Sequence, residues 1–278
     1  VTADDMVLTS GSGEAIGIVI QALTDPGDVV LVEEFVYLGT LNQMRRYGAD
    51  CVGIKCDDDG IIPEDLDSVI TEQKAKGKKV KYLYTIPAFQ NPMGWTMSLE
   101  RRKQVLEVTG KHGIPVFEDD CYADLRFSGE DVTSFHSLDD TGRVVYVGSF
   151  SKIIAPGMRM GYLVAPKDVI ARAWSFKSGG AVSQFTALTI AEFMKGNVNR
   201  HIEEQNEALI AKRDAMVAAL GENFGNTVSW TVPEGGLYIW VKFPEGTDLA
   251  AVQEDIFHDG VSYYNGSQFS PTGEGSNY

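Results

Sequence analysis

The sequence predicts an α/β fold in which a mainly parallel sheet of seven strands lies between layers of helices. From residue 1 to about residue 165, short β-rich runs alternate with amphipathic helical segments, which is the pattern of such a sheet. The runs are apolar on both sides, as strands buried under helices are. After Pro166 the chain becomes mainly helical. We therefore expect a large domain at residues 1–196 and a smaller α/β domain at residues 197–278.

The individual segments support this prediction in chain order. The seven strands of the sheet are expected at residues 6–8, 29–32, 51–54, 80–84, 115–117, 144–147 and 161–164. A helix is expected at residues 14–23, where apolar residues recur at helical spacing before the terminator Asp25-Pro26-Gly27. Another is expected at residues 98–112, between the N-cap Ser98 and Gly113. Further helices are expected at residues 168–177, 185–195, 198–220 and 249–258, with further strands at 228–232 and 238–241.

Composition excludes several classes of protein. Hydrophobic residues make up 44% and charged residues 23%, which is typical of a globular chain and not of a disordered one. The net charge of −15 disfavours nucleic acid and anionic membranes, and the densest basic stretch, residues 74–81, is expected to be a solvated loop. No window approaches the length of a membrane span, and the first residues resemble no signal peptide. We expect a cytoplasmic protein that binds neither nucleic acid nor membrane.

The cysteines and histidines indicate neither a disulfide framework nor a metal site. Cys51, Cys56 and Cys121 are odd in number and contain no Cys-x-x-Cys pair, which is typical of reduced thiols. The four histidines are far apart, and none has a partner at metal-ligand spacing. We expect no metal in this protein.

The sharpest chemical signal is Ser149-Phe150-Ser151-Lys152, which directly follows a predicted strand. Burial of a lysine at the end of an apolar strand favours the neutral amine that Schiff-base chemistry needs. The two serine hydroxyls, with Arg159 close behind, could hold a phosphate. On its own the motif also fits an ordinary surface lysine in a loop.

A glycine-rich turn, Ser10-Gly11-Ser12-Gly13, joins the first strand to the first helix. Glycines let the backbone approach a ligand, and a helix start offers unpaired N–H groups and the positive end of its dipole. The turn therefore predicts a phosphate cradle. It lacks the spacing of a dinucleotide site and the lysine of a P-loop, so a plain tight turn is the alternative.

Two more signals follow strands at the edge where open α/β sheets bind ligands. In Glu118-Asp119-Asp120-Cys121-Tyr122, a carboxylate can pair with a cationic ring nitrogen and a phenol can bond an adjacent ring oxygen. The alternative is that these acids only solvate a strand exit. In residues 87–94, prolines fix the backbone and could hold the Asn91 amide in the same crevice, with a cis bond between Asn91 and Pro92.

Taken together, the four signals supply a lysine, an acid for a pyridine nitrogen, a phenol and an amide for a ring oxygen, and a phosphate nest. This set fits pyridoxal 5′-phosphate (PLP) as the cofactor. Four such features at one edge of one sheet are much less probable as coincidence than any single one of them.

At these motifs the chain resembles the fold-type-I, class I/II PLP-dependent aminotransferases, in particular the subgroup of 2-aminoadipate and kynurenine aminotransferases. The resemblance runs from Asp5 to about Tyr278. It rests on three motifs that match in residue type, order and spacing: Gln90-Asn91-Pro92-x-Gly94, Asp119-x-x-Tyr122, and Ser149-x-Ser151-Lys152 followed by Pro156-Gly157-x-Arg159-x-Gly161.

The resemblance implies a role for each matching residue. Lys152 would bind the cofactor aldehyde covalently and then move the substrate's proton. Asp119 would keep the pyridine nitrogen protonated, and Tyr122 and Asn91 would bond the phenolate oxygen, with Asn91 also facing the substrate. Tyr37 would stack on the ring, with an ordinary tyrosine at a helix start as the alternative. The phosphate would be bound by Ser12, Gly13, Ser149, Ser151 and Arg159.

The chain also departs from the family pattern. Gly11-Ser12-Gly13-Glu14 stands where relatives usually have Gly-Ser-Gln-Gln, so we expect the phosphate to lose a side-chain amide contact. Met93 replaces a threonine of the Asn-Pro-Thr-Gly loop. The family's N-terminal arm and its arginine for the substrate carboxylate have no counterpart in these 278 residues, and we expect a chain truncated at both ends with an incomplete second domain.

The resemblance implies a homodimeric enzyme that moves an amino group from 2-aminoadipate, an aromatic or another large amino acid to a 2-oxo acid such as 2-oxoglutarate. Two alternatives share the constellation. One is a PLP-dependent lyase or synthase of the same fold, because substrate-facing groups decide the reaction. The other is the PLP-binding, effector-sensing domain of a winged-helix transcription regulator. An α/β protein without cofactor is a third interpretation.

Overall fold

The computed structural model describes residues 2–278 and contains the expected sheet of seven strands. Their order across the sheet is β1-β9-β8-β7-β6-β2-β3. The strands are β1 (Met6–Thr9), β2 (Val29–Glu33), β3 (Asp50–Ile54), β6 (Val80–Thr85), β7 (Val116–Asp120), β8 (Val144–Ser149) and β9 (Gly161–Val164). Each predicted strand of this sheet is confirmed to within three residues at either end.

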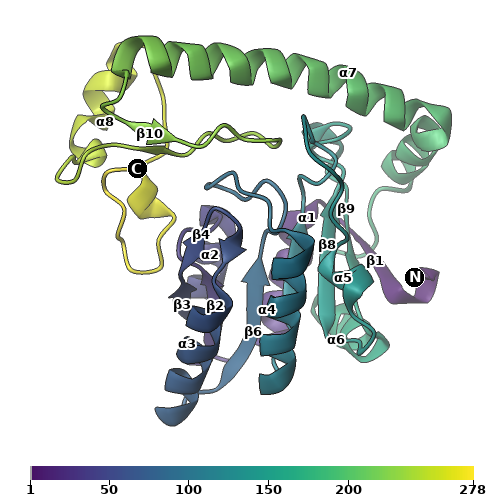
Figure 1. The fold of residues 1–278 in the computed structure, drawn as a ribbon. Coiled ribbons are helices and arrows are strands. Elements are labelled where there is room, and N and C mark those ends of the chain that lie inside the picture. The colour runs from purple at the N-terminus through teal and green to yellow at the C-terminus, as the bar shows by residue number, and fades with distance from the viewer. Residues whose placement is uncertain (1) are drawn as a thin grey trace.

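Strand β9 runs in the opposite direction to the other strands of this sheet. It pairs antiparallel with β1 and with β8, whereas the pairs among β8, β7, β6, β2 and β3 are parallel. The carboxyl ends of the parallel strands therefore meet at one edge of the sheet. In Figure 1 this edge faces upward, toward the long helix α7 (Gln184–Phe224) that crosses above it.

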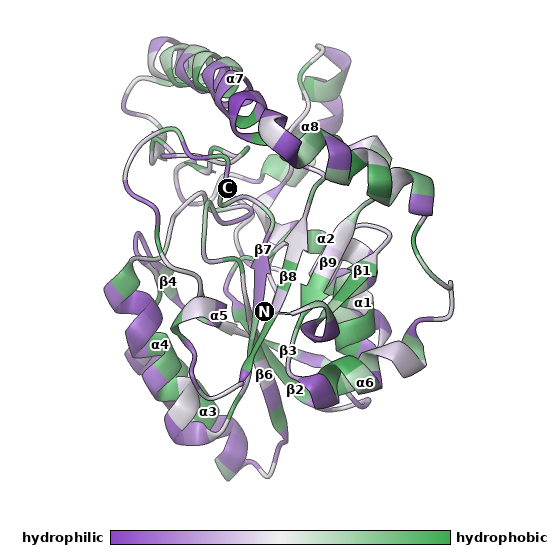
Figure 2. Cartoon of the chain, turned by 90° about the vertical axis from the view of Figure 1, so that its right-hand side faces the viewer, coloured by the Kyte–Doolittle hydropathy of each residue, from purple (hydrophilic) through white to green (hydrophobic). Residues whose placement is uncertain are grey.

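Helices cover both faces of the sheet. They are α1 (Ser12–Leu23), α2 (Leu38–Arg46), α3 (Pro63–Ala75), α4 (Leu99–His112), α5 (Phe135–Leu138) and α6 (Lys167–Phe176). Figure 2 shows α3 and α4 on one side of the sheet and α1 and α6 on the other. Strand alternation builds two cores, because Val30 and Val32 pack with α1 while Leu31 packs with α3 and α4.

Some short elements differ from the sequence prediction. No helix was expected at α2 or α5, and no hairpin at β4 (Cys56–Asp57) and β5 (Gly60–Ile61). The basic stretch at residues 74–81 is an exposed loop only at residues 76–79, since α3 ends at Ala75 and β6 begins at Val80. These elements are short or polar, so their local hydrophobic pattern is weak.

The C-terminal part follows α7. The two helices expected at residues 185–195 and 198–220 are confirmed as the two halves of α7, which meet at a kink at Lys195 and Gly196, where the backbone leaves helical angles. The expected strands at residues 228–232 and 238–241 shrink to β10 (Ser229–Trp230) and β11 (Val241–Lys242), followed by α8 (Leu249–His258). The division into domains at residues 196 and 197 stays a prediction, and the kink lies at this point.

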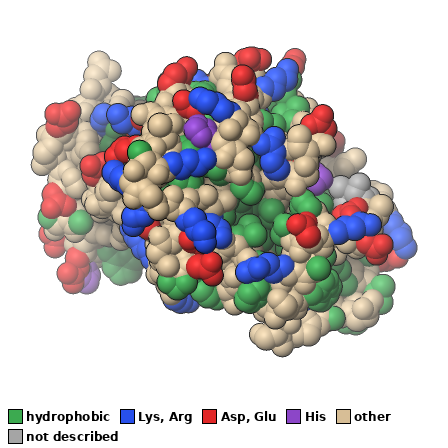
Figure 3. Space-filling view, turned by 90° about the horizontal axis from the view of Figure 1, so that it is seen from below, with side chains coloured by type: hydrophobic (Ala, Val, Ile, Leu, Met, Phe, Trp, Pro, Cys, Tyr) green, Lys and Arg blue, Asp and Glu red, His purple; other side chains and the backbone are tan. Residues whose placement is uncertain are grey.

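The surface mixes both signs of charge. Figure 3 shows the face below the sheet, where Lys and Arg side chains alternate with Asp and Glu and form no continuous basic patch. Within residues 2–278, no helix combines the length and the apolar character that crossing a bilayer requires. Over the same residues, no group of three His, Cys, Asp or Glu side chains is arranged to hold a metal ion.

Candidate active site

Asp119 lies at the carboxyl end of β7 and is only 2% exposed. Tyr84 Oη donates to its Oδ2 at 2.6 Å, and Cys121 Sγ donates to its Oδ1 at 2.8 Å. Burial raises the pKa of Asp119, and these two hydrogen bonds oppose that rise without any Lys or Arg contributing. A buried carboxylate without a cation nearby is well suited to a positively charged ligand group.

Asn91 and Tyr122 meet beside this carboxylate. Asn91 follows β6 in a loop with a cis peptide bond to Pro92, as the sequence suggested, and its Nδ2 donates to Tyr122 Oη at 3.2 Å. Both side chains are buried, and burial raises the pKa of Tyr122 far above its usual value, so the phenol keeps its proton. Tyr238, from the C-terminal part, packs edge-on against Tyr122 with ring centroids 6.4 Å apart.

A buried clamp that sequence reasoning missed holds the Asn91 loop. The fully buried Glu33 at the end of β2 accepts hydrogen bonds from Thr85 Oγ1 at 2.6 Å, Ile86 N at 2.8 Å and Gln90 Nε2 at 2.8 Å. Gln90 Oε1 in turn accepts from Met93 N at 2.7 Å. Burial raises the pKa of Glu33 to about 8, although its hydrogen bonds oppose the rise. This clamp fixes the backbone on both sides of Asn91.

Lys152 extends past the same edge. It follows β8, which pairs with β7 in parallel register, so both strands end side by side. The Lys152 side chain is half-buried, and its Nζ lies 6.0 Å from the centroid of the Tyr122 ring. The backbone oxygen of Lys152 accepts a hydrogen bond from Gln205 Nε2 of α7 at 2.6 Å. The long helix above the sheet therefore holds the loop that carries the lysine.

Tyr37 stands beside this group at the N-cap of α2. Its side chain is 40% exposed, and its pKa is raised by burial and by the nearby Tyr238 and Asp119. The ring lies over Gly39, where a Cβ atom would collide with it. The glycine therefore leaves the space that the Tyr37 ring occupies.

The start of α1 forms the other end of the site. Gly11 is its N-cap with a φ of 85°, and Ser12 and Gly13 occupy the first turn with their N–H groups pointing out of the helix. A Cβ at Gly13 would meet nothing within 4 Å, so the space above the turn is open. Cys121 Sγ reaches Ser12 Oγ at 3.7 Å, which joins this turn to the strand that carries Asp119.

Of the remaining predicted phosphate ligands, Arg159 lies at this turn, while Ser149 and Ser151 bond each other at the end of β8. The Arg159 guanidinium lies against Gly11, where a Cβ would collide with it, and its Nη2 donates to Ser10 O at 3.2 Å. Ser149 Oγ accepts from Ser151 N at 3.2 Å. Glu14 turns away from the open space, since its carboxylate accepts from Ser10 N at 2.6 Å and pairs with Lys177 at 2.9 Å. Glu14, which stands where relatives usually have a glutamine, is thus engaged by Ser10 and Lys177.

The residues present fit PLP, a molecule with a basic ring nitrogen, a phenolate oxygen, an aldehyde and a phosphate. Among the described residues, no Lys or Arg contributes to the electrostatics of the buried Asp119 carboxylate, and a protonated ring nitrogen would supply a positive charge. Asn91 Oδ1 is buried without a hydrogen-bond partner among residues 2–278 and can accept a hydrogen bond from a ligand donor, while its Nδ2 is the group that can donate to a phenolate oxygen. The helix start and Arg159 offer donors to an anion at the opposite end. All ten predicted site residues thus lie along one edge of the sheet.

Comparison with known proteins agrees with this geometry. The family model "Aminotransferase class I and II" matches residues 1–274. Aromatic-amino-acid aminotransferase 1 from Thermococcus litoralis is 37% identical over 268 residues, which are 95% of this chain and 64% of that protein. The HTH-type transcriptional regulator YjiR of Escherichia coli, itself uncharacterised, is 32% identical over 99% of this chain and 58% of its own length. The chain thus spans less than two thirds of the length of these relatives.

Among solved structures, the kynurenine aminotransferase of Pyrococcus horikoshii in complex with PMP superimposes with a TM-score of 0.94. It is 37% identical, and the match covers all of this chain and 70% of that one. The fold is therefore that of the fold-type-I aminotransferases, as the motifs implied. The cofactor of this family is PLP. From the family model and these similarities we conclude that the chain belongs to the class I and II aminotransferases.

Proposed function

We propose that this protein is a PLP-dependent aminotransferase that moves an amino group from an amino acid to a 2-oxo acid. The observation that carries the proposal is the grouping at one sheet edge of Lys152, with its Nζ 6.0 Å from the Tyr122 ring, and the buried Asp119 carboxylate. Family membership supports the same reaction, because the matching model spans residues 1–274.

Each of these residues has a distinct task in the proposed reaction. When bound, PLP supplies an electron sink for the carbanion at the substrate Cα. Lys152 Nζ binds the cofactor aldehyde and afterwards moves the proton to and from Cα. Asp119 would hold a proton on the ring nitrogen by its negative charge, which acts strongly because this carboxylate is buried. Tyr122 and Asn91 direct hydrogen bonds to the phenolate oxygen, and Asn91 also faces the substrate.

The other residues hold the cofactor in place. Ser12 and the Gly13 N–H bind the phosphate at the positive end of α1, together with Ser149, Ser151 and Arg159. The Arg159 guanidinium provides two parallel donors for this purpose. Tyr37 covers one face of the cofactor ring, and its own ring fits in this position because Gly39 has no side chain.

For the substrate we propose 2-aminoadipate, an aromatic or another large amino acid, with 2-oxoglutarate as the amino acceptor. The names of similar proteins support this class, since they include an aromatic-amino-acid aminotransferase and the bovine kynurenine/alpha-aminoadipate aminotransferase at 30% identity. A panel of amino acids assayed with 2-oxoglutarate ranks the candidates by kcat/KM.

The decisive experiment measures the proposed bond and the proposed reaction separately. Purified protein incubated with PLP should turn yellow, and borohydride reduction should leave a phosphopyridoxyl label on Lys152 that mass spectrometry of peptides locates. A Lys152→Ala variant serves as the matched control, and it should lose the label and at least about 10³-fold in activity. A colourless wild-type protein without label contradicts the proposal.

A regulatory domain is the second candidate, because the chain also matches HTH-type regulators over nearly its whole length. Such a domain would bind PLP at Lys152 but produce no glutamate from 2-oxoglutarate. A lyase of the same fold would instead release products of elimination. Product analysis of the PLP-loaded protein with the same amino acid panel distinguishes all three.

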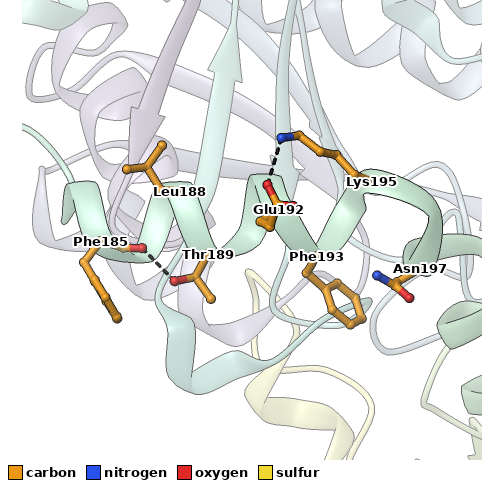
Figure 4. A pocket seen from close by; sticks show the side chains of 7 residues that line it. All are labelled: Phe185, Leu188, Thr189, Glu192, Phe193, Lys195 and Asn197. Atoms are coloured by element: carbon orange, nitrogen blue, oxygen red, sulfur yellow. Dashed lines mark hydrogen bonds and ion pairs between the residues drawn. The ribbon is translucent and has the colours of Figure 1, made fainter.

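We also propose that the protein acts as a homodimer, as the family resemblance implies. Supporting this, Phe185 and Leu188 on α7 are 83% and 60% exposed and, with Phe193, line an open cavity of about 690 Å³ (Figure 4). Exposed apolar side chains in one patch are typical of an interface. Light scattering should give twice the protomer mass, and Phe185→Asp should shift the protein toward the monomer.

A further inference from the structure

Two tyrosines of β6, Tyr82 and Tyr84, have similar surroundings, but Tyr84 makes one more hydrogen bond. They lie two positions apart and therefore on the same face of the strand, and both are fully buried. Each ring stands edge-on to Phe117, with centroids 5.9 Å away for Tyr82 and 5.2 Å for Tyr84. Each hydroxyl lies 3.1 Å from a threonine hydroxyl, that of Thr24 or that of Thr40. Tyr84 alone also reaches Asp119.

The hydrogen bonds around Tyr84 all point toward the Asp119 carboxylate. Tyr84 Oη has a single proton, which it donates to Asp119 Oδ2 at 2.6 Å, so the Thr40 hydroxyl must donate to Tyr84. Burial raises the pKa of Tyr84 well above its ordinary value, and therefore the phenol remains a donor at any working pH. The relay from Thr40 through Tyr84 ends on one defined oxygen of Asp119.

Tyr84 itself has little freedom to move. Its ring is packed against Phe117, and Thr40 lies in the first turn of α2, which the buried Leu41 and Met44 anchor on the sheet. Strand pairing sets the contact, because Tyr84 pairs with Phe117 and Asp119 follows two positions later on β7. A rigid donor of this kind restricts the rotation of the carboxylate that it binds.

We propose that Tyr84 is a positioning residue that holds the Asp119 carboxylate in the orientation in which it meets the cofactor ring nitrogen. This inference rests on the proposed function, and it adds a residue that none of the sequence motifs contains. Tyr84 does not touch the reacting atoms. It acts through Asp119, as the Glu33 clamp acts through the Asn91 loop.

The experiment compares Tyr84→Phe with Tyr82→Phe, since each variant removes one buried hydroxyl from the same strand face. The unfolding temperature of the cofactor-free protein should fall by about 2–4 °C in Tyr82→Phe and by more in Tyr84→Phe, whose hydroxyl also bonds a buried carboxylate. Only Tyr84→Phe should lower kcat, by about tenfold at saturating PLP with KM little changed, and weaken PLP binding by about fivefold in an absorbance titration. Tyr82→Phe should have the kcat and the PLP affinity of the wild type.

A second pair of variants tests the relay. Thr40→Val removes the donor behind Tyr84 and should lower kcat by about two- to threefold, whereas Thr40→Ser keeps a hydroxyl and should restore most of it. Equal kcat and equal PLP affinity in Tyr84→Phe and Tyr82→Phe would overturn the inference while leaving a transaminating wild type intact. A wild type that binds no PLP would overturn the inference together with the proposed function.

Discussion

The two ends of the site differ in how far the protein has already organised them. At the ring end, Asn91, Asp119 and Tyr122 are 1%, 2% and 6% exposed, and protein hydrogen bonds hold all three. At the phosphate end, Gly13 and Arg159 are exposed, and the first turn of α1 has donors to spare. Buried, fixed groups act on the chemical step because they need no rearrangement, whereas exposed donors mainly add affinity. The predictions below test this difference.

The largest effect is expected at the ring end. With saturating PLP, Asp119→Ala should lower kcat by about 10²-fold, because the charge that keeps the ring nitrogen protonated is lost. The cofactor-free variant should also unfold somewhat earlier than the wild type, since Tyr84 Oη and Cys121 Sγ lose the buried acceptor to which they donate. Stopped-flow or steady-state kinetics and a thermal scan measure the two quantities. If Asp119→Ala instead weakened PLP binding and kept its kcat, the ring end would behave like the phosphate end, and the proposed difference between them would be wrong.

At the phosphate end, Arg159→Ala should weaken PLP binding by about 10- to 100-fold, the range for losing a charge-assisted pair of hydrogen bonds. At saturating PLP its kcat should stay within about threefold of the wild type. Arg159→Lys serves as the control. Its PLP affinity should lie between those of the wild type and Arg159→Ala, because an ammonium keeps the charge but not the two parallel donors. Equilibrium titration with PLP gives the dissociation constants, and a large drop in kcat would count against the comparison.

The Glu33 clamp predicts a pH dependence of stability. The folded-state pKa of Glu33 is about 8, above its ordinary value of 4.5, so the stabilisation is complete below pH 4.5 and disappears as the pH rises to about 8. Glu118 and Asp120, with pKa values of about 7 and 6, contribute at lower pH. Between pH 7 and 8 the cofactor-free wild type should lose up to about 1 kcal/mol of unfolding free energy through Glu33.

Glu33→Gln should flatten this pH dependence, even though its amide opposes the donors of the clamp and lowers stability overall. Glu34→Gln is the matched control, because Glu34 is the next residue, is half-buried and bonds Cys56 N instead of the Asn91 loop. Urea unfolding at pH 6, 7, 8 and 9 measures the slopes. An unchanged slope in Glu33→Gln would mean that another group titrates in this window.

The smallest effect is expected at Tyr37, the residue proposed to stack on the cofactor ring. Gly39→Ala places a methyl group where the Tyr37 ring lies, and the ring must move. PLP affinity should fall by about threefold, roughly the loss of part of one aromatic contact. Gly221→Ala, at a position on α7 where a Cβ meets nothing, is the control for an added methyl group and should leave the affinity unchanged. The same titration ranks the two variants.

The sequence could predict the strands and the site motifs because both are local. Seven short apolar runs became the seven strands of the sheet, and Ser98 caps α4 through its bond from Arg101 N at 3.2 Å. Helix α2 was missed, since its pattern is mostly polar and only Thr40, Leu41 and Met44 are buried. Such a helix gains its stability from packing on the sheet, which no local pattern reveals.

By itself, the sequence determined which residues carry chemistry: a lysine after one strand, an acid and a phenol after another, an amide after a third and a helix start rich in glycine. Only the tertiary structure decided how these groups are held. Tyr84 and Glu33 resemble core residues of buried strands, and their importance depends on the register of β6 with β7 and β2. Register joins residues that lie 35 and 57 positions apart in the hydrogen bonds Tyr84–Asp119 and Glu33–Gln90. Contacts at such separations arise from the packing of the whole sheet and leave no local signal.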